Sequence, residues 1–342
     1  MKLVVSSSPH VVSPESVPFL MRQVVFALLP ALAAAAYFFG PYAVFLVVVS
    51  TGTAVACEAV WQKITGRPVS VHDWSAVITG ILLAYNLPPR APWWLAVVGS
   101  AFAIIVAKQL FGGLGHNFIN PALAGRAFLL ASWPAAMTSW VTPFDARTTA
   151  TPLPLLIPKG QELAGVAAPS YWDLFAGAVP GCLGETSALA LLAGGLYLVW
   201  RRVIDWRIPA WYLGTAAVLG WILGGPRGLF GGDPLYHLLA GGLILGAFFM
   251  ATDWVTTPVT RRGRVIFAVG CGILTVLIRV YGGYPEGVSY SILLMNLATP
   301  LIDRYTVPRQ FGAPARPPRA PAARPPQTGH GHAHHAPARE GR

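Results

Sequence analysis

The sequence is poor in charge, since only 11% of its 342 residues are Asp, Glu, Lys or Arg. Soluble globular domains carry about 25% charged residues. Hydrophobic residues make up 54% of the chain, and its mean hydropathy is +0.56. This composition argues against a soluble enzyme, a nucleic-acid-binding module and a disordered chain, and it predicts a polytopic membrane protein.

Cysteine is equally scarce. Cys57, Cys182 and Cys271 have no metal-binding spacing and are odd in number, so we expect no cysteine-bound metal cluster and no disulfide framework. The sequence also lacks a Ser-His-Asp arrangement, a phosphate-binding lysine loop, an H-E-x-x-H motif and a removable signal peptide. No metal site and no self-contained catalytic site are therefore predicted.

Ten apolar segments are candidates for transmembrane helices, because a spanning helix needs about 20 mostly apolar residues. They cover about 20–39, 42–61, 73–88, 92–111, 118–137, 186–201, 208–225, 235–252, 264–281 and 287–303. The third and sixth are short, and the fifth contains Pro121, Gly125 and Arg126. Such helices are tolerated at membrane depth where they line a cavity in the protein.

The basic residues are distributed unequally between the two sides of the membrane in this topology. With a cytoplasmic N-terminus, thirteen Lys and Arg residues fall at inner ends and loops, and four fall outside. This bias follows the positive-inside rule. It predicts a multi-pass membrane protein with both termini in the cytoplasm, so the net charge of +11 indicates orientation rather than nucleic-acid binding.

An internal repeat relates residues 72–89 to residues 237–258. Each stretch is followed by a helix that ends in a basic residue and a glycine pair, Gly112–Gly113 or Gly282–Gly283, and then by a helix containing Asn. The topology places one glycine pair inside and the other outside. The expected fold is therefore all-α, with two inverted five-helix repeats and a ligand pathway at their interface.

The predicted organisation has five parts. They are a cytoplasmic N-terminal segment (1–18), a first membrane repeat (19–137), an extracytoplasmic loop (138–185), a second membrane repeat (186–305) and a disordered Pro/Arg/His-rich cytoplasmic tail (306–342). The tail contains four clustered histidines, His330, His332, His334 and His335. A metal site is one interpretation of this cluster, and a solvated basic tail near anionic lipid is the favoured one.

Segment 112–134 is the first candidate site. Asn117 and Asn120 can hydrogen-bond a polar ring edge, and Arg126 inside a span points to a functional role, because an unpaired charge there is costly. The alternative is helix packing through small residues.

Three further segments hold the remaining candidates. Glu185, Thr186 and Ser187 precede an apolar run, where a helix cap is favoured over an exposed hydroxyl that is modified on the outer side. Thr252 and Asp253 follow the eighth span, where Asp253 either pairs with a cation or belongs to a plain inner turn with a basic anchor. Glu286 lies at an outer glycine turn, as part of the turn or as a gate for a cation.

Five segments together resemble a known family. They are GGLGHNFINPALAGRAFLLASWP, GETSALALL, RRVIDWRIP, ATDWVTTPVT and RVYGGYPEGVSYSILLMNLATPLID. In this order they resemble the RnfD/NqrB family, which contains the D subunit of the Rnf ion-translocating oxidoreductase and the B subunit of the sodium-pumping quinone reductase. The resemblance runs from about residue 19 to residue 309, and the short N-terminal segment favours the Rnf type.

The resemblance implies a membrane flavoprotein. In this family FMN is joined through its phosphate to a threonine hydroxyl by a flavin transferase on the outer side, which maps to Thr186 here. The residues differ from the usual Ser/Thr-Gly-Ala-Thr pattern, so Ser187 is an alternative acceptor, and Trp254 stands where many relatives have Pro. The family also implies a place in the bacterial inner membrane, and it suggests a second, non-covalent flavin (riboflavin) that the resemblance does not place on particular residues. Asn117, Asn120, Arg126, Thr252 and Asp253 are candidates for lining a flavin or ion site.

The implied function is that of one component of an electron-transport complex, not catalytically complete alone. Electrons pass between ferredoxin and NAD while Na⁺ or H⁺ crosses the membrane, and the expected partners are subunits of the A, B, C, E and G types together with membrane lipid. The flavins carry the redox chemistry, and the protein supplies binding and orientation. The alternatives are a component of a quinone reductase and an inverted-repeat transporter with no redox role.

Overall fold

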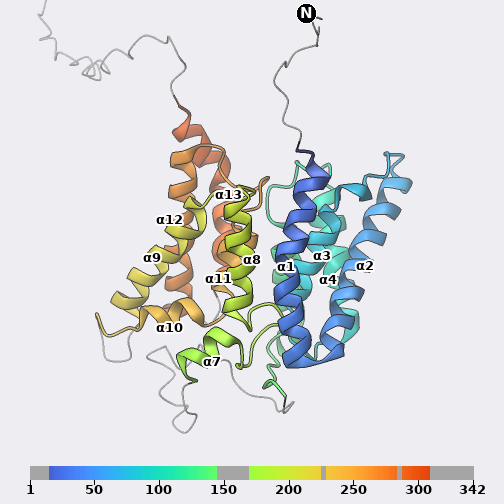
Figure 1. Ribbon diagram of the computed structural model, residues 1–342. Helices are drawn as coiled ribbons and strands as arrows, with labels where there is room; N and C mark the ends of the chain where they lie inside the picture. The colour runs from blue at the N-terminus through green and yellow to red at the C-terminus, as the bar shows by residue number, and fades with distance from the viewer. Residues whose placement is uncertain (1–14, 145–168, 225–228, 283–286, 309–342) are drawn as a thin grey trace, which may run out of the picture. The chain divides into compact units, whose positions relative to one another are not determined.

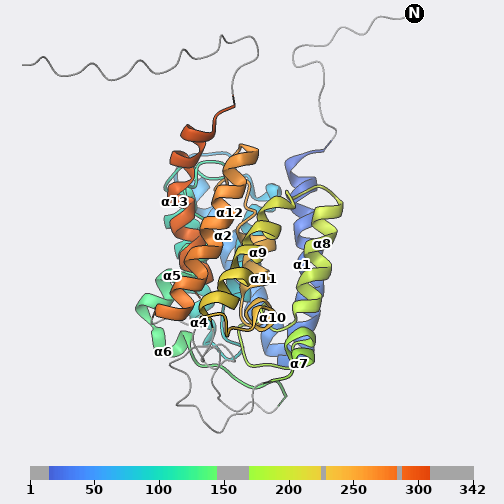
Figure 2. The same cartoon turned by 90° about the vertical axis from the view of Figure 1, so that its left-hand side faces the viewer.

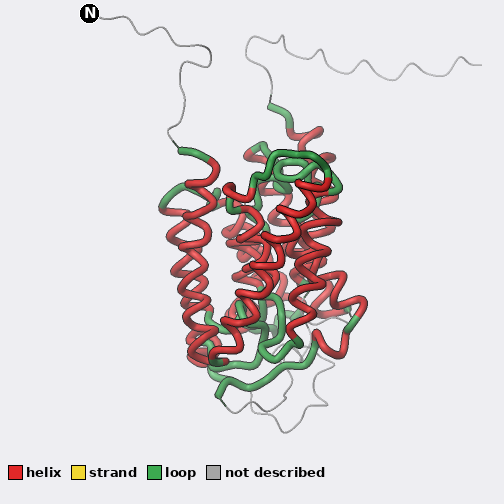
Figure 3. The backbone as a smooth tube through the Cα atoms, turned by 90° about the vertical axis from the view of Figure 1, so that its right-hand side faces the viewer, coloured by secondary structure: helices red, strands yellow, loops and turns green. Residues whose placement is uncertain are grey.

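The computed structural model describes residues 15–144, 169–224, 229–282 and 287–308, and these residues form helices and loops with no β-strand (Figures 1 and 3). All of the helices belong to one unit that ends at Thr306. The four tail histidines and Glu286 lie outside the described residues.

Three helices are long and apolar enough to cross a membrane: α1 (Val17–Phe39), α2 (Pro41–Ile64) and α12 (Arg261–Tyr281). The junction between α1 and α2 shows why the chain turns there. Gly40 adopts a φ of +79°, which side chains disfavour, and Pro41 begins the next helix with its fixed φ. An all-helical membrane protein is thus confirmed.

The other helices are shorter. The longer ones among them are α3 (Ser75–Tyr85), α4 (Trp93–Ala101), α5 (Pro121–Ser132), α8 (Ala188–Trp200), α9 (Arg207–Leu223) and α13 (Val288–Thr306). The short ones are η1 (Val71–Asp73), α6 (Pro134–Met137), α7 (Tyr171–Ala176), α10 (Pro234–Leu239), α11 (Leu243–Leu245) and the two π-helices, η2 (Phe102–Gln109) and η5 (Gly246–Met250).

Several predicted segments differ from the structure. The predicted helix 118–137 ends at Ser132, because Pro134 forces Trp133 out of the helical conformation. The predicted helix 235–252 is interrupted after Leu239, where Gly241 has a φ of +75°. The predicted outer loop 138–185 contains α7, which begins with a capping box between Ser170 and Asp173.

The first residue of α1 and the last residue of α13 lie at the same end of the helical bundle, which we call the proximal end (Figures 1 and 2). The turns after α8 and η5 are also at this end. The opposite, distal end holds the turn between α1 and α2 and the segment that leads from α7 into α8 (Figure 1). The two candidate sites are found at these two ends.

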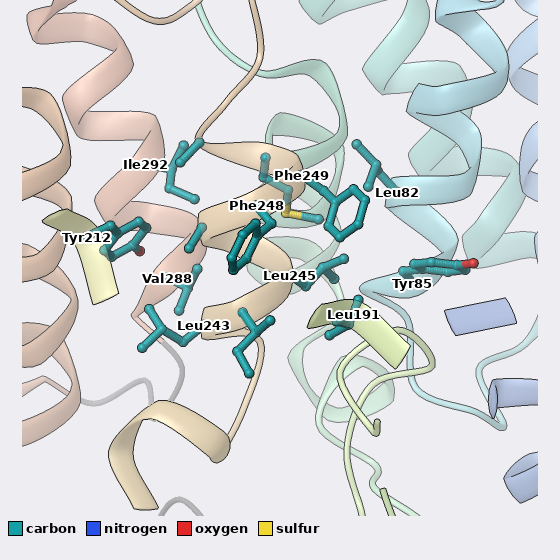
Figure 4. Packing of buried hydrophobic residues seen from close by; sticks show 14 of the residues in the cluster. Leu82, Tyr85, Leu191, Tyr212, Leu243, Leu245, Phe248, Phe249, Val288 and Ile292 are labelled. Carbon is teal, nitrogen blue, oxygen red and sulfur yellow. The ribbon is translucent and has the colours of Figure 1, made fainter. Parts of the chain in front are cut away.

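One hydrophobic core joins the first half of the chain to the second. In Figure 4, Leu82 of α3 faces Leu245 and Phe249 of the α11–η5 segment, and Val288 and Ile292 of α13 lie behind Phe248. Helices from the two halves also pack directly, α1 on α8 and α5 on α13 (Figure 2). Residues far apart in sequence are therefore held side by side around the η5 segment.

Candidate functional site

The structure divides the predicted site residues into two groups. Asn117, Asn120, Thr252 and Asp253 line one cavity at the proximal end, which we call the proximal cavity. Arg126, Glu185, Thr186 and Ser187 do not line it. They gather instead where the α7–α8 segment meets the end of α3, which we call the distal loop.

Asn120 organises the wall of the proximal cavity. Its side-chain oxygen accepts the N–H groups of Ala122 and Leu123 at 3.0 and 3.3 Å, so it caps α5. Its amide nitrogen donates to the carbonyl of Met250 at 3.2 Å. One buried side chain therefore fixes the start of α5 against the end of η5, 130 residues later in the chain.

Thr252 and Asp253 face the same space from the turn that follows η5. The Thr252 hydroxyl donates to the Phe248 carbonyl at 2.6 Å, and Asp253 accepts the Thr256 hydroxyl at 3.2 Å. Burial raises the pKa of Asp253, while hydrogen bonds and the nearby Lys108 ammonium act in the opposite direction. The half-buried Asp253 carboxyl is thus close to the buried Lys108 ammonium, which lines the same cavity.

The proximal cavity combines this polar rim with apolar walls that include Leu82, Phe248 and Phe249. Its enclosed space is about 100 Å³, and its whole empty volume, opening included, is about 810 Å³. Cavities that bind organic cofactors have the same make-up, mostly apolar with a few placed polar groups. A planar ring would require the side chains at the opening to separate.

Lys108 and Ser75 also line this cavity. Neither is among the site residues predicted from the sequence. Lys108 donates to both carboxylate oxygens of Glu58, at 2.8 and 3.1 Å, and to the Ser75 hydroxyl at 2.6 Å. Gln109 adds a bond of 2.6 Å to the same carboxylate. The available signal was the presence of Glu58 and Lys108 within otherwise apolar runs.

The distal loop is held to the end of α3 by backbone hydrogen bonds. Leu183 donates to the Leu87 carbonyl at 3.0 Å, and Gly184 donates to the Tyr85 carbonyl at 2.9 Å. A Cβ on Gly184 would lie 2.3 Å from the Tyr85 Cβ. Glycine is therefore required for this close approach.

The two hydroxyls of the distal loop have different roles. Ser187 caps α8 by accepting the N–H of Ala190 at 3.3 Å. The Thr186 hydroxyl donates to the Leu183 carbonyl at 3.3 Å, and Thr186 is only 1% exposed. The expectation of an exposed hydroxyl at this position is wrong, because the loop folds against α3.

Arg126 brings a buried positive charge to the distal loop. Its guanidinium donates to the Asn86 side-chain oxygen at 2.5 Å and lies 3.8 Å from the Cys182 sulfur. The Glu185 carboxylate accepts the Cys182 N–H at 3.2 Å. The loop that contains Thr186 is thus contacted by a buried cation.

The structure also shows what Trp254 contacts. Trp254 donates its indole N–H to the Val203 carbonyl at 3.0 Å, so it joins the turn after η5 to the turn after α8. No group of three or more His, Cys, Asp or Glu side chains with metal-binding geometry occurs among the described residues.

Comparison with known proteins gives consistent matches along nearly the whole chain. The model of the NQR2, RnfD, RnfE family matches residues 4–312. The chain is 56% identical over 316 residues to the D subunit of the Na(+)-translocating ferredoxin:NAD(+) oxidoreductase complex of Acetobacterium woodii, covering 91% of this chain and 96% of that protein.

Two further relatives extend the comparison. The D subunit of the proton-translocating ferredoxin:NAD(+) oxidoreductase complex of Clostridium ljungdahlii is 48% identical over 316 residues, with 90% of this chain and 96% of that protein covered. The D subunit of the ion-translocating oxidoreductase complex of Alcanivorax borkumensis is 41% identical over 338 residues, with 91% and 97% covered.

Proposed function

The chain belongs to the NQR2, RnfD, RnfE family, and from that premise we propose that it carries FMN on Thr186 as a flavoprotein. It is a membrane component of an Rnf-type ion-translocating oxidoreductase complex. Electron transfer between ferredoxin and NAD belongs to the assembled complex. We propose Na⁺ or H⁺ as the coupled ion, because the two relatives named for a specific ion differ in it.

The choice of Thr186 as acceptor is supported by the hydrogen bonds of the distal loop. Ser187 is engaged as the cap of α8, and its modification would remove that cap. The Thr186 hydroxyl is bound only to the Leu183 carbonyl within its own loop and is not part of the cap. Esterification of Thr186 would therefore leave the α8 cap in place, and this contrast is the observation that carries the proposal.

The surroundings of Thr186 suit a phosphoester. The linkage has a negative charge, and a buried anion requires a positive partner. Arg126 contacts the same loop, and the Glu185 carboxylate is bound to the Cys182 N–H. When bound, FMN would supply one- and two-electron chemistry, while Arg126 would hold its phosphate end and the Tyr85–Gly184 contact would fix the loop.

The burial of Thr186 implies an order of events. A transferase cannot reach a hydroxyl that is 1% exposed, so the distal loop has to leave the end of α3 during modification. Its attachment there involves the two backbone hydrogen bonds from Leu183 and Gly184. We propose that modification precedes the final packing of this loop.

In-gel flavin fluorescence after denaturation tests the linkage. The complex is expressed with its flavin transferase, and wild type, Thr186→Ala and Ser187→Ala are compared. Wild type and Ser187→Ala should keep a fluorescent band, and Thr186→Ala should lose it. A dark wild-type band would remove the flavin proposal and favour a non-redox transporter. A fluorescent Thr186→Ala band together with a dark Ser187→Ala band would move the acceptor to Ser187.

We propose the proximal cavity as the place of a second, non-covalent flavin. Asn117, Asn120, Thr252 and Asp253 offer donors and acceptors, and Lys108 offers a positive charge, beside the apolar Phe248 wall. The non-covalent flavin can be tested by denaturing the complex and measuring the released flavin by chromatography. Thr252→Val should reduce released flavin and leave the covalent band of Thr186 intact, whereas an unchanged released fraction would exclude the cavity.

We propose ten membrane spans in two inverted repeats, with both termini cytoplasmic. The packing of α1 on α8 and α5 on α13 supports this, because these pairs are equivalent helices of the two repeats. Reporter fusions after Thr65, Arg90, Arg201 and Thr306 test it. Cytoplasmic signals after Thr65, Arg201 and Thr306 and an external signal after Arg90 are expected, and any reversed signal would contradict the topology.

The quinone-reductase alternative differs in the electron partner. We propose subunits of the A, B, C, E and G types and a flavin transferase as the partners of this chain. Reduction of NAD by ferredoxin, compared with reduction of quinone, distinguishes the two complexes. Activity with quinone alone would favour the alternative.

A further inference from the structure

A basic cavity opens at the proximal end between the turn after α8 and the start of α12. Its lining includes four arginines, Arg202, Arg207, Arg261 and Arg264, and a single carboxylate, Asp205. Its empty volume, with its wide opening, is about 1560 Å³. We call it the arginine pocket, and its excess of positive charge requires an anionic partner.

Asp205 neutralises only part of this charge. It accepts Arg264 at 2.7 Å and Arg207 at 3.1 Å. Within the described ranges, the side chains of Arg202 and Arg261 make no ion pair or hydrogen bond, and both residues are exposed. Arg202 is moreover held at a φ of +58°, a costly conformation for a residue with a side chain.

Two helices point their N-terminal ends at the arginine pocket. α9 begins at Arg207 and α12 begins at Arg261, and both residues line it. Helix N-termini carry partial positive charge, which favours phosphate; at these two ends Asp205 accepts the N–H of Arg207, and Thr260 accepts that of Gly263. The helix ends and the arginines therefore select the same kind of ligand.

An apolar groove lies between α8 and α9, further along the bundle from the arginine pocket. Its end nearer the arginine pocket is lined by Leu192 of α8, Leu213 of α9 and Ile244 of α11. The rest of the groove lies toward the distal end, where α7 and α10 line it with Tyr171, Trp172, Phe175, Leu235, Leu238 and Leu239. Leu213 follows Arg207 by six residues, or about 9 Å along α9. Figure 1 shows α9 diverging from α8, with α11 between them.

The edge of the arginine pocket has the residues of a membrane interface. Trp200, Trp206 and Trp254 are exposed, and the Arg207 guanidinium lies 5.6 Å from the centre of the Trp206 ring. Tryptophan is enriched at the level of lipid headgroups. The pocket thus belongs at the headgroup level of the proximal side, and the Leu213 end of the groove lies within reach of an acyl chain that starts there.

We infer that the arginine pocket and the Leu213 end of the α8–α9 groove bind one anionic phospholipid of the inner leaflet. Its phosphate would lie between Arg202 and Arg261, and an acyl chain would follow Leu213. The charge of the pocket matches the head, and the apolar groove beyond it matches the tail. Basic pockets between helices on the cytoplasmic side are known lipid sites. The inference depends on membrane insertion and not on flavin.

The test uses the purified, delipidated complex. Its thermal stability is measured with dioctanoyl-phosphatidylglycerol, with dioctanoyl-phosphatidylcholine, with glycerophosphoglycerol and with inorganic phosphate. Only the first should raise the midpoint of unfolding. An equal rise with phosphate or with the free headgroup would reveal a simple anion site, and an equal rise with phosphatidylcholine would show that charge plays no part. Either result would overturn the inference.

A variant pair assigns the effect to the arginine pocket. Arg202→Gln with Arg261→Gln should require about 30-fold more phosphatidylglycerol for the same stabilisation, since each arginine near anionic lipid contributes about fivefold. Arg22→Gln, an exposed arginine of α1, is the matched control and should respond as wild type does. Equal responses of the double variant and wild type would contradict the assignment.

A photoactivatable phosphatidylglycerol then identifies the occupant of the groove. It should label the peptide that contains Leu213 in wild type and lose most of that label in the double variant. If chemical cross-links from a cysteine at position 213 join another protein of the complex instead, a protein helix fills the groove and the inference is wrong. Covalent flavin fluorescence, recorded in the same samples, keeps this result separate from the flavin proposal.

Discussion

Lys108 lies with its ammonium nitrogen 2.8 Å from a carboxylate oxygen of Glu58, and their side chains are 2% and 1% exposed. The two residues come from the π-helix η2 and from α2, and they meet behind the proximal cavity. The two charges compensate each other within the bundle. Ser75 accepts a further hydrogen bond from Lys108, and Gln109 donates one to Glu58. The positive charge of Lys108 is thereby fixed beside the proposed flavin position.

Removing one member of this pair should destabilise the protein strongly. Glu58→Gln leaves Lys108 as an uncompensated buried charge, which typically costs about 3–5 kcal/mol. The expected result is a large fall in the denaturant midpoint of the purified complex. Glu58→Leu combined with Lys108→Met should recover most of the loss, because no charge remains buried. A double variant as unstable as Glu58→Gln would show that the pair contributes through more than charge compensation.

The contact between Glu58 and Lys108 could not be predicted from the sequence. Apolar length predicts helices, and the charge bias predicts which ends share a side of the membrane. Neither indicates that two charges 50 residues apart meet, because this depends on the rotation of each helix about its axis. The π-turns of η2 change that rotation locally, and a hydropathy pattern does not reveal them.

The second prediction concerns Gly184. Alanine at this position would place a Cβ 2.3 Å from the Tyr85 Cβ, and overpacking of this kind costs about 1–3 kcal/mol. The distal loop should be displaced, so that covalent flavin per protein falls although Thr186 is unchanged. The absorbance of flavin in the denatured complex measures covalent flavin per protein. Gly52→Ala is the control, because nothing lies within 4 Å of its added Cβ.

The third prediction is a pH dependence. Burial alone would raise the pKa of Asp205, but the N–H of Arg207 and the guanidinium of Arg264 lower it below its usual value. A lowered pKa means that the stabilisation is complete above the unfolded pKa of about 3.9 and is lost as the pH falls through the folded value.

Asp205→Asn isolates this effect. At pH 6 the variant should be less stable than wild type by about 1 kcal/mol, the usual upper range for a partly exposed ion pair. The difference should shrink below about pH 4, where Asp205 is protonated first in the unfolded chain and then, below its lowered pKa, in the folded protein. Unfolding midpoints of both proteins from about pH 3.5 to about pH 7 test it, and a difference that grows toward acid pH would contradict the sign.

The sequence predicts which residues belong to the candidate site, but it does not predict how they are arranged in space. Asn117 and Asn120 are predicted as groups that hydrogen-bond a ring edge, and Thr252 and Asp253 as polar residues at an inner helix end; all four share a cavity. Arg126, which is predicted from the cost of a charge inside a span, lies with the distal loop. Asn120 begins α5, whereas Arg126 comes six residues later, so the helix itself carries them about 9 Å apart along its axis.

The fourth prediction tests Arg126 as the cation of the distal loop. Arg126→Ala removes the donor to Asn86 and leaves a buried amide oxygen without that bond, at a cost of about 1–3 kcal/mol. It also removes the charge beside the proposed phosphoester. Both the unfolding midpoint and the covalent flavin per protein should therefore fall.

Arg126→Lys separates the two contributions. Lysine keeps the charge, but its single ammonium group cannot reach Asn86 and Cys182 as the forked guanidinium does. Covalent flavin should recover more than stability if the charge serves the phosphoester. If stability recovers and covalent flavin does not, Arg126 only packs the loop against α3, and the positive partner of the phosphoester has to be sought elsewhere in the distal loop.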